Sequence, residues 1–167
     1  IPLIFANVND PDKKLRLCLD GQYIKVLESY KMPVKLEDLP LALKVLSPFD
    51  RLGKTDDQRG FHLLSVTPES RPLLTFEYKG RFISFRALPF GAPRAPHEFQ
   101  KCNMVPLNYA RNFGIQSLLF LDDRLFYTQN VVNGINVDLY LGTILTVAMG
   151  GYISLDKSHF EPTYRCL

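Results

Sequence analysis

The chain has 167 residues, of which 46% are apolar and 22% are charged, and its formal net charge is +3. This length and composition suit one folded domain with a real core, and no run of about 18 apolar residues predicts a membrane-spanning helix. The charge excess lies in residues 51–100, where eight basic residues face five acidic ones, which suits a polyanion partner or a solvated charged face.

The first half of the chain predicts mainly strands. A strand is expected at residues 15–19, and a helix at about 38–46, where Asp38 can cap the first turn. Further strands are expected at residues 61–66, 73–78 and 81–87. The last two of these strands are joined by Lys79-Gly80, a two-residue link that is typical of a β-hairpin.

The next segment predicts a helix and a second hairpin. Pro96 can open a helix that carries Phe99, Cys102 and Leu107 inward, with an interruption at Pro106. Apolar residues 115–120 and 125–127 then flank Asp122-Asp123. This pattern predicts a hairpin with two acidic residues at its tip.

The last part predicts an amphipathic helix capped by Asn136 and stopped by Gly150-Gly151, and then a strand at residues 152–155. Its core-facing stripe is expected to be Val137, Tyr140, Leu141, Ile144, Leu145 and Ala148. Strands in hairpins mixed with helices favour an α+β fold, an antiparallel sheet covered by helices on one face.

The cysteines predict free thiols. Cys18, Cys102 and Cys166 are too far apart in sequence to resemble a zinc-binding pair or a disulfide framework. A reducing, intracellular compartment, cytoplasmic or nuclear, is therefore expected.

Two acidic segments carry the clearest chemical signal. Asp122-Asp123 follows an apolar strand, where an unpaired charge is costly unless water, a base such as Arg124 or a divalent cation offsets it. Asp56-Asp57 supplies carboxylates from a distant segment. Two-metal phosphoryl transfer needs such a set, and hard oxygen ligands favour Mg²⁺ or Mn²⁺. The residues alone leave solvated turn acids as the alternative.

Four motifs follow one another along the chain. They are Leu15-Arg16-Leu17-Cys18-Leu19-Asp20, Asp56 through Gly60-Phe61-His62, Leu88-Pro89-Phe90-Gly91 with Ala95-Pro96 and Phe99, and Phe120-Leu121-Asp122-Asp123. In this order they resemble the reverse transcriptases of retroelements, and the sequences of residues 88–99 and 111–123 are more similar to those of retrotransposons than to those of vertebrate retroviruses. Residues 151–162 are similar to the segment after the catalytic hairpin of that family.

The resemblance implies a reverse-transcriptase palm with partial fingers, as one domain over residues 1–167. It places the thumb, connection and ribonuclease H parts outside this chain, and makes the rest of a retroelement polyprotein a partner. The implied activity is RNA-directed DNA polymerisation. Its partners would be an RNA or DNA template, a primer and a deoxynucleotide triphosphate, with no membrane.

The resemblance also implies roles for the acidic residues. Asp56, five residues before an aromatic, and Asp122 would be the main ligands of two Mg²⁺ or Mn²⁺ ions, with Asp123 in support. Asp57 falls where a backbone carbonyl usually helps the metal. Lys157 would protonate the departing pyrophosphate, with an ordinary surface lysine as the alternative.

Four further residues match the substrate-binding motifs of the family. Arg16 would grip the triphosphate, and Phe61 would exclude a 2′-hydroxyl. Phe90 and Gly91 would belong to the nucleotide pocket and template path. Without the motifs, Arg16 would be interpreted as an exposed arginine on a strand, and Phe61 as a residue packed in the core.

Three departures from the family pattern favour a rival function. The segment 54–59 is more polar than the usual strand around the first aspartate, Arg124 can pair with a carboxylate and compete with the metal, and residues 92–94 replace a small apolar stretch. The rival is a catalytically inactive remnant or a domesticated nucleic-acid-binding module. A third alternative is an RNA-dependent RNA polymerase, against which Leu121 and Phe61 argue.

Overall fold

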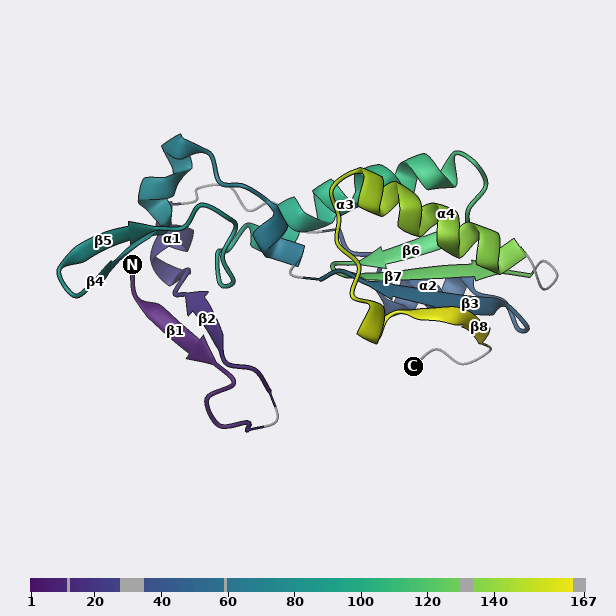
Figure 1. The fold of residues 1–167 in the computed structure, drawn as a ribbon, viewed down its shortest axis with the longest axis horizontal. Coiled ribbons are helices and arrows are strands. Elements are labelled where there is room, and N and C mark those ends of the chain that lie inside the picture. Colours follow the sequence, from purple (N-terminus) through teal and green to yellow (C-terminus); the bar gives the residue numbers. More distant parts are fainter. Residues whose placement is uncertain (12, 28–34, 59, 130–133, 164–167) are drawn as a thin grey trace. The chain divides into compact units, whose positions relative to one another are not determined.

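The computed structural model describes residues 1–11, 13–27, 35–58, 60–129 and 134–163. They divide into two compact units, one drawn from residues 1–33 and 61–98 and the other from residues 34–60 and 99–167. Figure 1 shows the elements of both units along the chain. The assignment of the whole chain to one domain stays a prediction.

The first unit contains two short antiparallel ribbons joined by helical turns. Its elements are β1 (Leu3–Ala6), β2 (Arg16–Leu19), α1 (Gln22–Leu27), η2 (Pro68–Leu74), β4 (Thr75–Tyr78) and β5 (Arg81–Ser84). β1 pairs with β2, and β4 pairs with β5. Lys79 and Gly80, at φ 50° and 72°, link β4 to β5, as the sequence predicted, and two positive φ values suit a turn that matches the twist of a hairpin.

One predicted strand in this region is wrong. Instead of a strand at 61–66, Gly60–Leu63 forms a 3₁₀ segment (η1). Val66 and Leu74 point into a small core with Leu19 and Ile24. An apolar run of this length does not distinguish a strand from a helical turn, and here tertiary packing selects the turn.

The second unit is built on a four-stranded antiparallel sheet in the order β6-β7-β3-β8. These strands are β6 (Ser117–Phe120), β7 (Asp123–Thr128), β3 (Arg51–Asp56) and β8 (His159–Thr163). The hairpin of β6 and β7 confirms the prediction of two strands around Asp122-Asp123. β3 lies inside the sheet between β7 and β8, so the polar segment around Asp56 forms a central strand.

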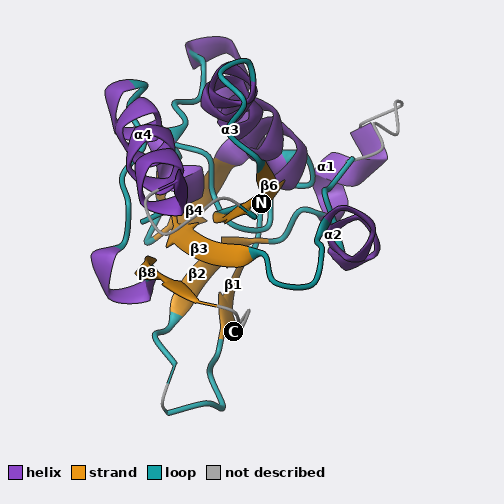
Figure 2. Ribbon diagram, turned by 90° about the vertical axis from the view of Figure 1, so that its right-hand side faces the viewer, coloured by secondary structure: helices purple, strands orange, loops and turns teal. Residues whose placement is uncertain are grey.

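Three α-helices and a 3₁₀ turn accompany this sheet. They are α2 (Leu39–Val45), α3 (Ala95–Arg111), α4 (Gly134–Ala148) and η3 (Leu155–Lys157). Figures 1 and 2 show α3 and α4 over one face of the sheet. Residues of α2 line a pocket with Leu118 and Phe120, which belong to the opposite face, so the helices are not confined to one face as expected. The combination of an antiparallel sheet with helices agrees with the prediction. Asp38 accepts a hydrogen bond from Leu41 N and caps α2 as predicted.

The predictions for α3 hold in part. Phe99 and Leu107 are buried, but Cys102 is exposed. A kink or a restart was expected near Pro106, and the helix continues through this residue without a restart. The expected strand at 152–155 is also wrong, because Leu155–Lys157 is a 3₁₀ turn. In both cases contacts with neighbouring elements decide the structure, and the local sequence does not show these contacts.

The core of the second unit lies between the sheet and the helices. It contains Leu107, Ala110, Ile115, Leu119, Phe126 and Leu139. Gly142 of α4 packs against Phe126, since a Cβ at this position would lie 2.3 Å from the phenyl ring. The absence of a side chain therefore allows α4 to approach β7 closely.

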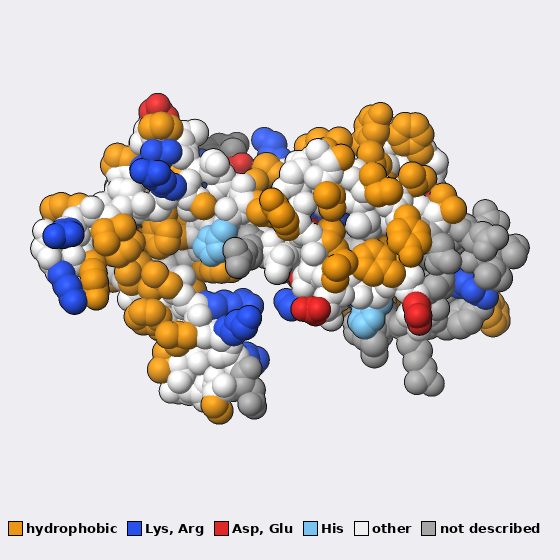
Figure 3. Space-filling model, in the orientation of Figure 1, with side chains coloured by type: hydrophobic (Ala, Val, Ile, Leu, Met, Phe, Trp, Pro, Cys, Tyr) orange, Lys and Arg blue, Asp and Glu red, His pale blue; other side chains and the backbone are white. Residues whose placement is uncertain are grey.

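The predicted buried stripe of α4 is wrong for most of its residues, although Leu145 does pack against the core. Val137, Tyr140, Leu141 and Ile144 are exposed by 45–60%, and Leu139 and Thr146 are buried instead. Figure 3 shows the resulting apolar surface over α4. The helix is apolar on most sides, so its periodicity did not identify which side faces the core. The helix also begins at Gly134, ahead of the expected cap Asn136.

In the part of the chain that the structure describes, no helix has both the length and the apolar character needed to cross a membrane.

Candidate active site

The two acidic segments meet in the second unit. Asp56 ends β3 and pairs in register with Asp123, the first residue of β7. Asp122 lies in the turn between β6 and β7, and its backbone carbonyl accepts a hydrogen bond of 2.9 Å from Asp57 N. Residues far apart in sequence are thus brought side by side by strand pairing.

The backbone of Asp56 is fixed by a third segment. Its N–H donates to Ser158 Oγ at 3.1 Å, and its carbonyl accepts from Ser154 N at 2.8 Å. Ser158 Oγ donates in turn to the Ser154 carbonyl at 2.6 Å. The segment after α4 therefore holds the end of the first acidic strand in place.

A buried ion pair lies beside the acids. Both terminal nitrogens of Arg124 bond the carboxylate of Asp57, Nη2 at 2.9 Å from Oδ2, and the two side chains are 0% and 1% exposed. Asn103 Nδ2 also donates to Asp57 Oδ2 at 2.7 Å. Arg124 does pair with a carboxylate, but its partner is Asp57 and not a predicted main metal ligand.

The turn that carries Asp122 is clamped by α3. Gln100 Nε2 donates to the Leu119 carbonyl at 3.1 Å, and Gln100 Oε1 accepts from Leu121 N at 2.8 Å. Asn103 reaches the Leu121 carbonyl at 3.3 Å. Leu121 has φ 56°, a conformation that is strained for a leucine, so these contacts hold a backbone that would otherwise relax.

Sequence reasoning missed Gln100 and Asn103. They lie three residues apart on the same helical face as the buried Leu107. Polar residues on a stripe that also carries core residues are the signal that could have identified them.

The electrostatics of the turn reflect the crowding of carboxylates. Partial desolvation, and then repulsion from Asp123, Asp56 and Asp57, raise the pKa of Asp122 above its ordinary value of 3.8, although a backbone hydrogen bond opposes this. Such mutual repulsion favours a protonated acid or a bound cation. The four carboxylates are therefore close enough to share one electrostatic site.

Two lysines face the predicted ligands. Lys157 Nζ lies 3.5 Å from Asp56 Oδ1, and Lys54 Nζ lies 3.0 Å from Asp123 Oδ1. The Lys157 side chain is 62% exposed, so its ion pair is easily exchanged. A lysine that reaches a predicted metal ligand is positioned for proton transfer near that ligand, but this role stays a prediction.

The acids suit a hard divalent cation in their chemistry. Oδ1 of Asp56 and Oδ1 of Asp123 are buried, and they form the ion pairs with Lys157 and Lys54. Asp122, the third predicted ligand, is exposed. However, no three carboxylate, histidine or cysteine side chains of the described residues are already arranged around one metal position. The donor set fits Mg²⁺ or Mn²⁺, and its final arrangement would have to form on binding.

The first unit gathers the four predicted substrate-binding residues. The Arg16 guanidinium lies 5.5 Å from the centre of the Phe90 ring, and Phe61 meets the same ring edge to face at 5.3 Å. Gly91 has φ 89°, and a Cβ there would lie 2.0 Å from the Leu19 carbonyl oxygen. Phe90 also accepts a hydrogen bond from Leu19 N at 2.7 Å. The residues therefore form one aromatic and basic cluster, whose binding role stays a prediction.

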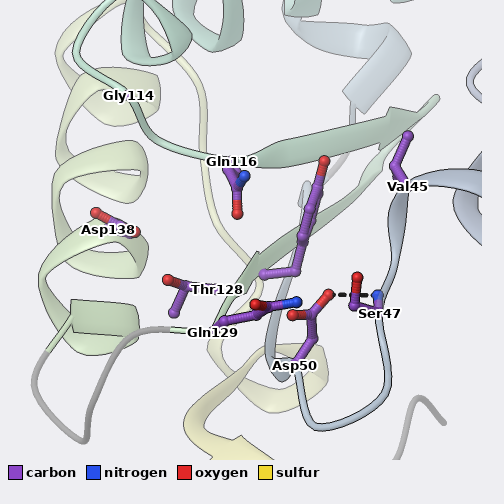
Figure 4. Close-up of a pocket in the computed structure, with 9 residues that line it drawn as sticks. Val45, Ser47, Asp50, Gly114, Gln116, Thr128, Gln129 and Asp138 are labelled. Atoms are coloured by element: carbon purple, nitrogen blue, oxygen red, sulfur yellow. Dashed lines mark hydrogen bonds between the residues drawn. The ribbon is translucent and has the colours of Figure 1, made fainter.

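A separate polar cavity of about 600 Å³ lies in the second unit, and sequence reasoning did not identify it (Figure 4). Asp50 and Asp138 line it from opposite sides. Ser47 N donates to Asp50 Oδ2 at 2.7 Å, but the buried Oδ1 has no hydrogen-bond partner among the described residues. None of the described lining residues is basic.

Replacing Asp138 with asparagine is expected to stabilise the chain at pH 7. Burial raises the pKa of Asp138 above its ordinary value of 3.8. Between the ordinary and the raised pKa the native state holds a proton that the unfolded state releases, so the stability of the parent falls as the pH rises. The asparagine side chain does not titrate, so the variant does not lose stability in this way as the pH rises.

Thermal unfolding across the acidic range checks this expectation. The midpoint of Asp138→Asn should exceed that of the parent at pH 7, and the two should converge as the pH falls below 3.8. The exposed Asp156→Asn serves as the control. An Asp138→Asn midpoint equal to or below the parent value at pH 7 would contradict the effect of burial.

No family model matches the chain, but its sequence is similar to those of known proteins. The chain is 29% identical over 126 residues to a retrovirus-related Pol polyprotein from transposon 412 of Drosophila melanogaster. It is 28% identical over 128 residues to the genome polyprotein of Petunia vein clearing virus. The matches cover 71% and 74% of this chain. Over these residues the chain is similar to the polyproteins of a transposon and of a virus.

These relatives are far longer than the chain, which spans 9% and 6% of their lengths. Among solved structures, the chain is similar to a foamy viral protease-reverse transcriptase in complex with double-stranded DNA, with TM-score 0.76 and 23% identity, over 95% of this chain and 32% of that one. The same viral protein with an RNA/DNA hybrid gives TM-score 0.70 and 19% identity, over 96% and 21%. These likenesses show that the fold, a mixed α/β fold with antiparallel sheets, is shared.

Proposed function

We propose that this chain is the palm, with part of the fingers, of a retrotransposon-type reverse transcriptase. Its reaction is the transfer of deoxynucleotides to the 3′-hydroxyl of a primer, directed by an RNA or DNA template. The observation that carries the proposal is the register of Asp56 with Asp123, beside the turn that holds Asp122. The likeness to reverse transcriptases in complex with double-stranded DNA and with an RNA/DNA hybrid supports nucleic acid as the partner.

In this proposal Asp56 and Asp122 hold two Mg²⁺ or Mn²⁺ ions, and Asp123 supports the same site. The ions would supply activation of the attacking primer hydroxyl and stabilisation of the leaving pyrophosphate. The buried carboxylate of Asp56, paired at 3.5 Å with an exposed lysine, and the burial and charge repulsion at Asp122 support this assignment, because a bound cation stabilises both charged carboxylates. Lys157, near Asp56, donates the proton to pyrophosphate.

The cluster of the first unit binds the incoming nucleotide. Arg16 offers a guanidinium that can bond a phosphate in two places, and its contact with Phe90 holds the planar group in one orientation. Phe61 excludes the 2′-hydroxyl of a ribonucleotide. The backbone at Gly91 approaches the substrate closely because no side chain intervenes.

A second function is favoured by one observation. Among the described residues no three ligands are already arranged around a metal position. A nucleic-acid-binding module that keeps the fold without catalysis would account for that. This alternative predicts binding to an RNA/DNA hybrid that does not depend on Asp56 or Asp122.

Primer extension separates the two functions. The chain is incubated with an oligo(dT) primer on a poly(rA) template, deoxythymidine triphosphate and Mn²⁺, and single additions are counted. The polymerase proposal expects addition that falls at least roughly 100-fold in Asp56→Asn and Asp122→Asn, while the exposed control Asp156→Asn stays at the parent level. Hybrid binding without addition in the parent would favour the binding module, and addition that survives both substitutions would refute the assigned acids.

A further inference from the structure

The pair of Arg124 and Asp57 has features that stability alone does not explain. It is a fully buried ion pair, and Arg124 Nε has no hydrogen-bond partner among the described residues. A buried pair with one unsatisfied donor is rarely more stable than two apolar side chains of similar size, because both charges lose their hydration. Its position next to the acids points to an electrostatic role.

The pair is attached to both acidic segments. Asp57 follows Asp56 directly, and Asp57 N donates to the Asp122 carbonyl at 2.9 Å. Arg124 follows Asp123 directly and lies opposite Thr55 in the register of β3 with β7. The bidentate contact therefore links the ends of the two strands immediately behind the predicted ligands.

Charge accounting shows what Arg124 does there. Four carboxylates, at Asp56, Asp57, Asp122 and Asp123, stand in two short segments. Lys54 and Lys157, the lysines that face them, are partly exposed, whereas the Arg124 guanidinium is buried and permanently charged. Both oxygens of Asp57 are occupied by Arg124, and Oδ2 also by Asn103, so Asp57 is not free to act as a ligand.

We propose that Arg124 is a positioning residue that neutralises Asp57 and reserves Asp56, Asp122 and Asp123 for the divalent cations. This inference rests on the proposed function. It adds that one buried ion pair controls the net charge of the site. Removal of either partner leaves a buried unit charge near the cations. The two removals must change cation affinity in opposite directions.

Calorimetric titration with Mn²⁺ tests this with variants that remove each charge and keep a polar side chain. Asp57→Asn leaves the Arg124 charge unpaired and should weaken Mn²⁺ binding about tenfold, whereas Arg124→Gln leaves Asp57 charged and should strengthen it about tenfold. The double variant restores neutrality and should return within about threefold of the parent. A purely structural pair would lower the unfolding midpoint of both single variants without this opposition of signs.

Two further arms keep the test decisive if a single variant does not fold. Arg124→Lys keeps the charge but loses the bidentate contact, so its Mn²⁺ affinity should stay within about threefold of the parent while its unfolding midpoint falls. A tenfold change in Arg124→Lys or in the double variant would overturn the inference, as would single variants that both weaken binding. No Mn²⁺ binding by the parent would overturn the proposed function as well, so the two failures are distinguishable.

Discussion

Replacing Arg124 with leucine is expected to lower the free energy of unfolding of the chain by roughly 3–5 kcal/mol. The substitution leaves the Asp57 carboxylate buried, with a hydrogen bond from Asn103 Nδ2 in place of the bidentate contact. The uncompensated buried carboxylate must then draw in water, which opposes the packing of β7 against β3. Urea unfolding followed by circular dichroism measures the loss.

The double variant Asp57→Leu/Arg124→Leu gives the matched comparison. It removes both charges, so most of the stability lost in Arg124→Leu should return. Lys157→Met is the control, since it breaks an ion pair whose lysine is 62% exposed and should change the free energy by less than about 1 kcal/mol. A double variant as unstable as Arg124→Leu would show that the pair is not the source of the loss.

Replacing Gln100 with alanine is expected to have the second largest effect, a loss of roughly 2–4 kcal/mol. Gln100 is 4% exposed, and its side chain satisfies both the Leu119 carbonyl and Leu121 N. Without it, two backbone groups near the core lose their partners. Fewer contacts then hold the backbone of Leu121 at its strained φ of 56°.

A second substitution at the turn checks that reason. Leu121→Gly removes the strain of the positive φ, so Gln100→Ala/Leu121→Gly should recover about 1 kcal/mol relative to Gln100→Ala. Gln116→Ala, at an exposed glutamine that precedes the same strand, should be nearly neutral. Equal losses in Gln100→Ala and Gln116→Ala would contradict the role of Gln100 as a clamp.

Much of the sheet scaffold could be predicted from local sequence. Asp38 caps α2, Lys79-Gly80 closes the hairpin of β4 and β5, and the apolar runs around Asp122-Asp123 form β6 and β7. In each case neighbouring residues carry the whole signal, so no distant contact was needed to infer the element. The same holds for β2, which was expected at residues 15–19 and forms at Arg16–Leu19.

The elements that failed depend on distant partners. The outward side of α4 was taken for its buried side, because Tyr140 and Ile144 are as apolar as Leu139, and only the approach of Gly142 to Phe126 selects the face. β8 was not predicted, because pairing with β3 defines it more than its own composition does. Local sequence patterns do not show which distant residues pack against or pair with an element.

The candidate site also combines residues that the sequence could predict with contacts that required the structure. Asp56, Asp122 and Asp123 could be named from motifs, and strand pairing brings them together. The pairing of Arg124 with Asp57 in particular, and the clamp by Gln100 and Asn103, required the structure, because their contacts join residues 18 or more positions apart.

The most direct test of the central claim, that Asp56 and Asp122 form a divalent-cation site, is the unfolding midpoint of the chain as Mn²⁺ is added. At free Mn²⁺ about 100 times the dissociation constant, the parent should gain roughly 2.7 kcal/mol of stability. Asp122→Asn should gain almost none, although without metal it should be at least as stable as the parent, because the substitution removes carboxylate repulsion. Asp156→Asn should respond like the parent. An equal Mn²⁺ response in the parent and Asp122→Asn, or none in either, would contradict the claim.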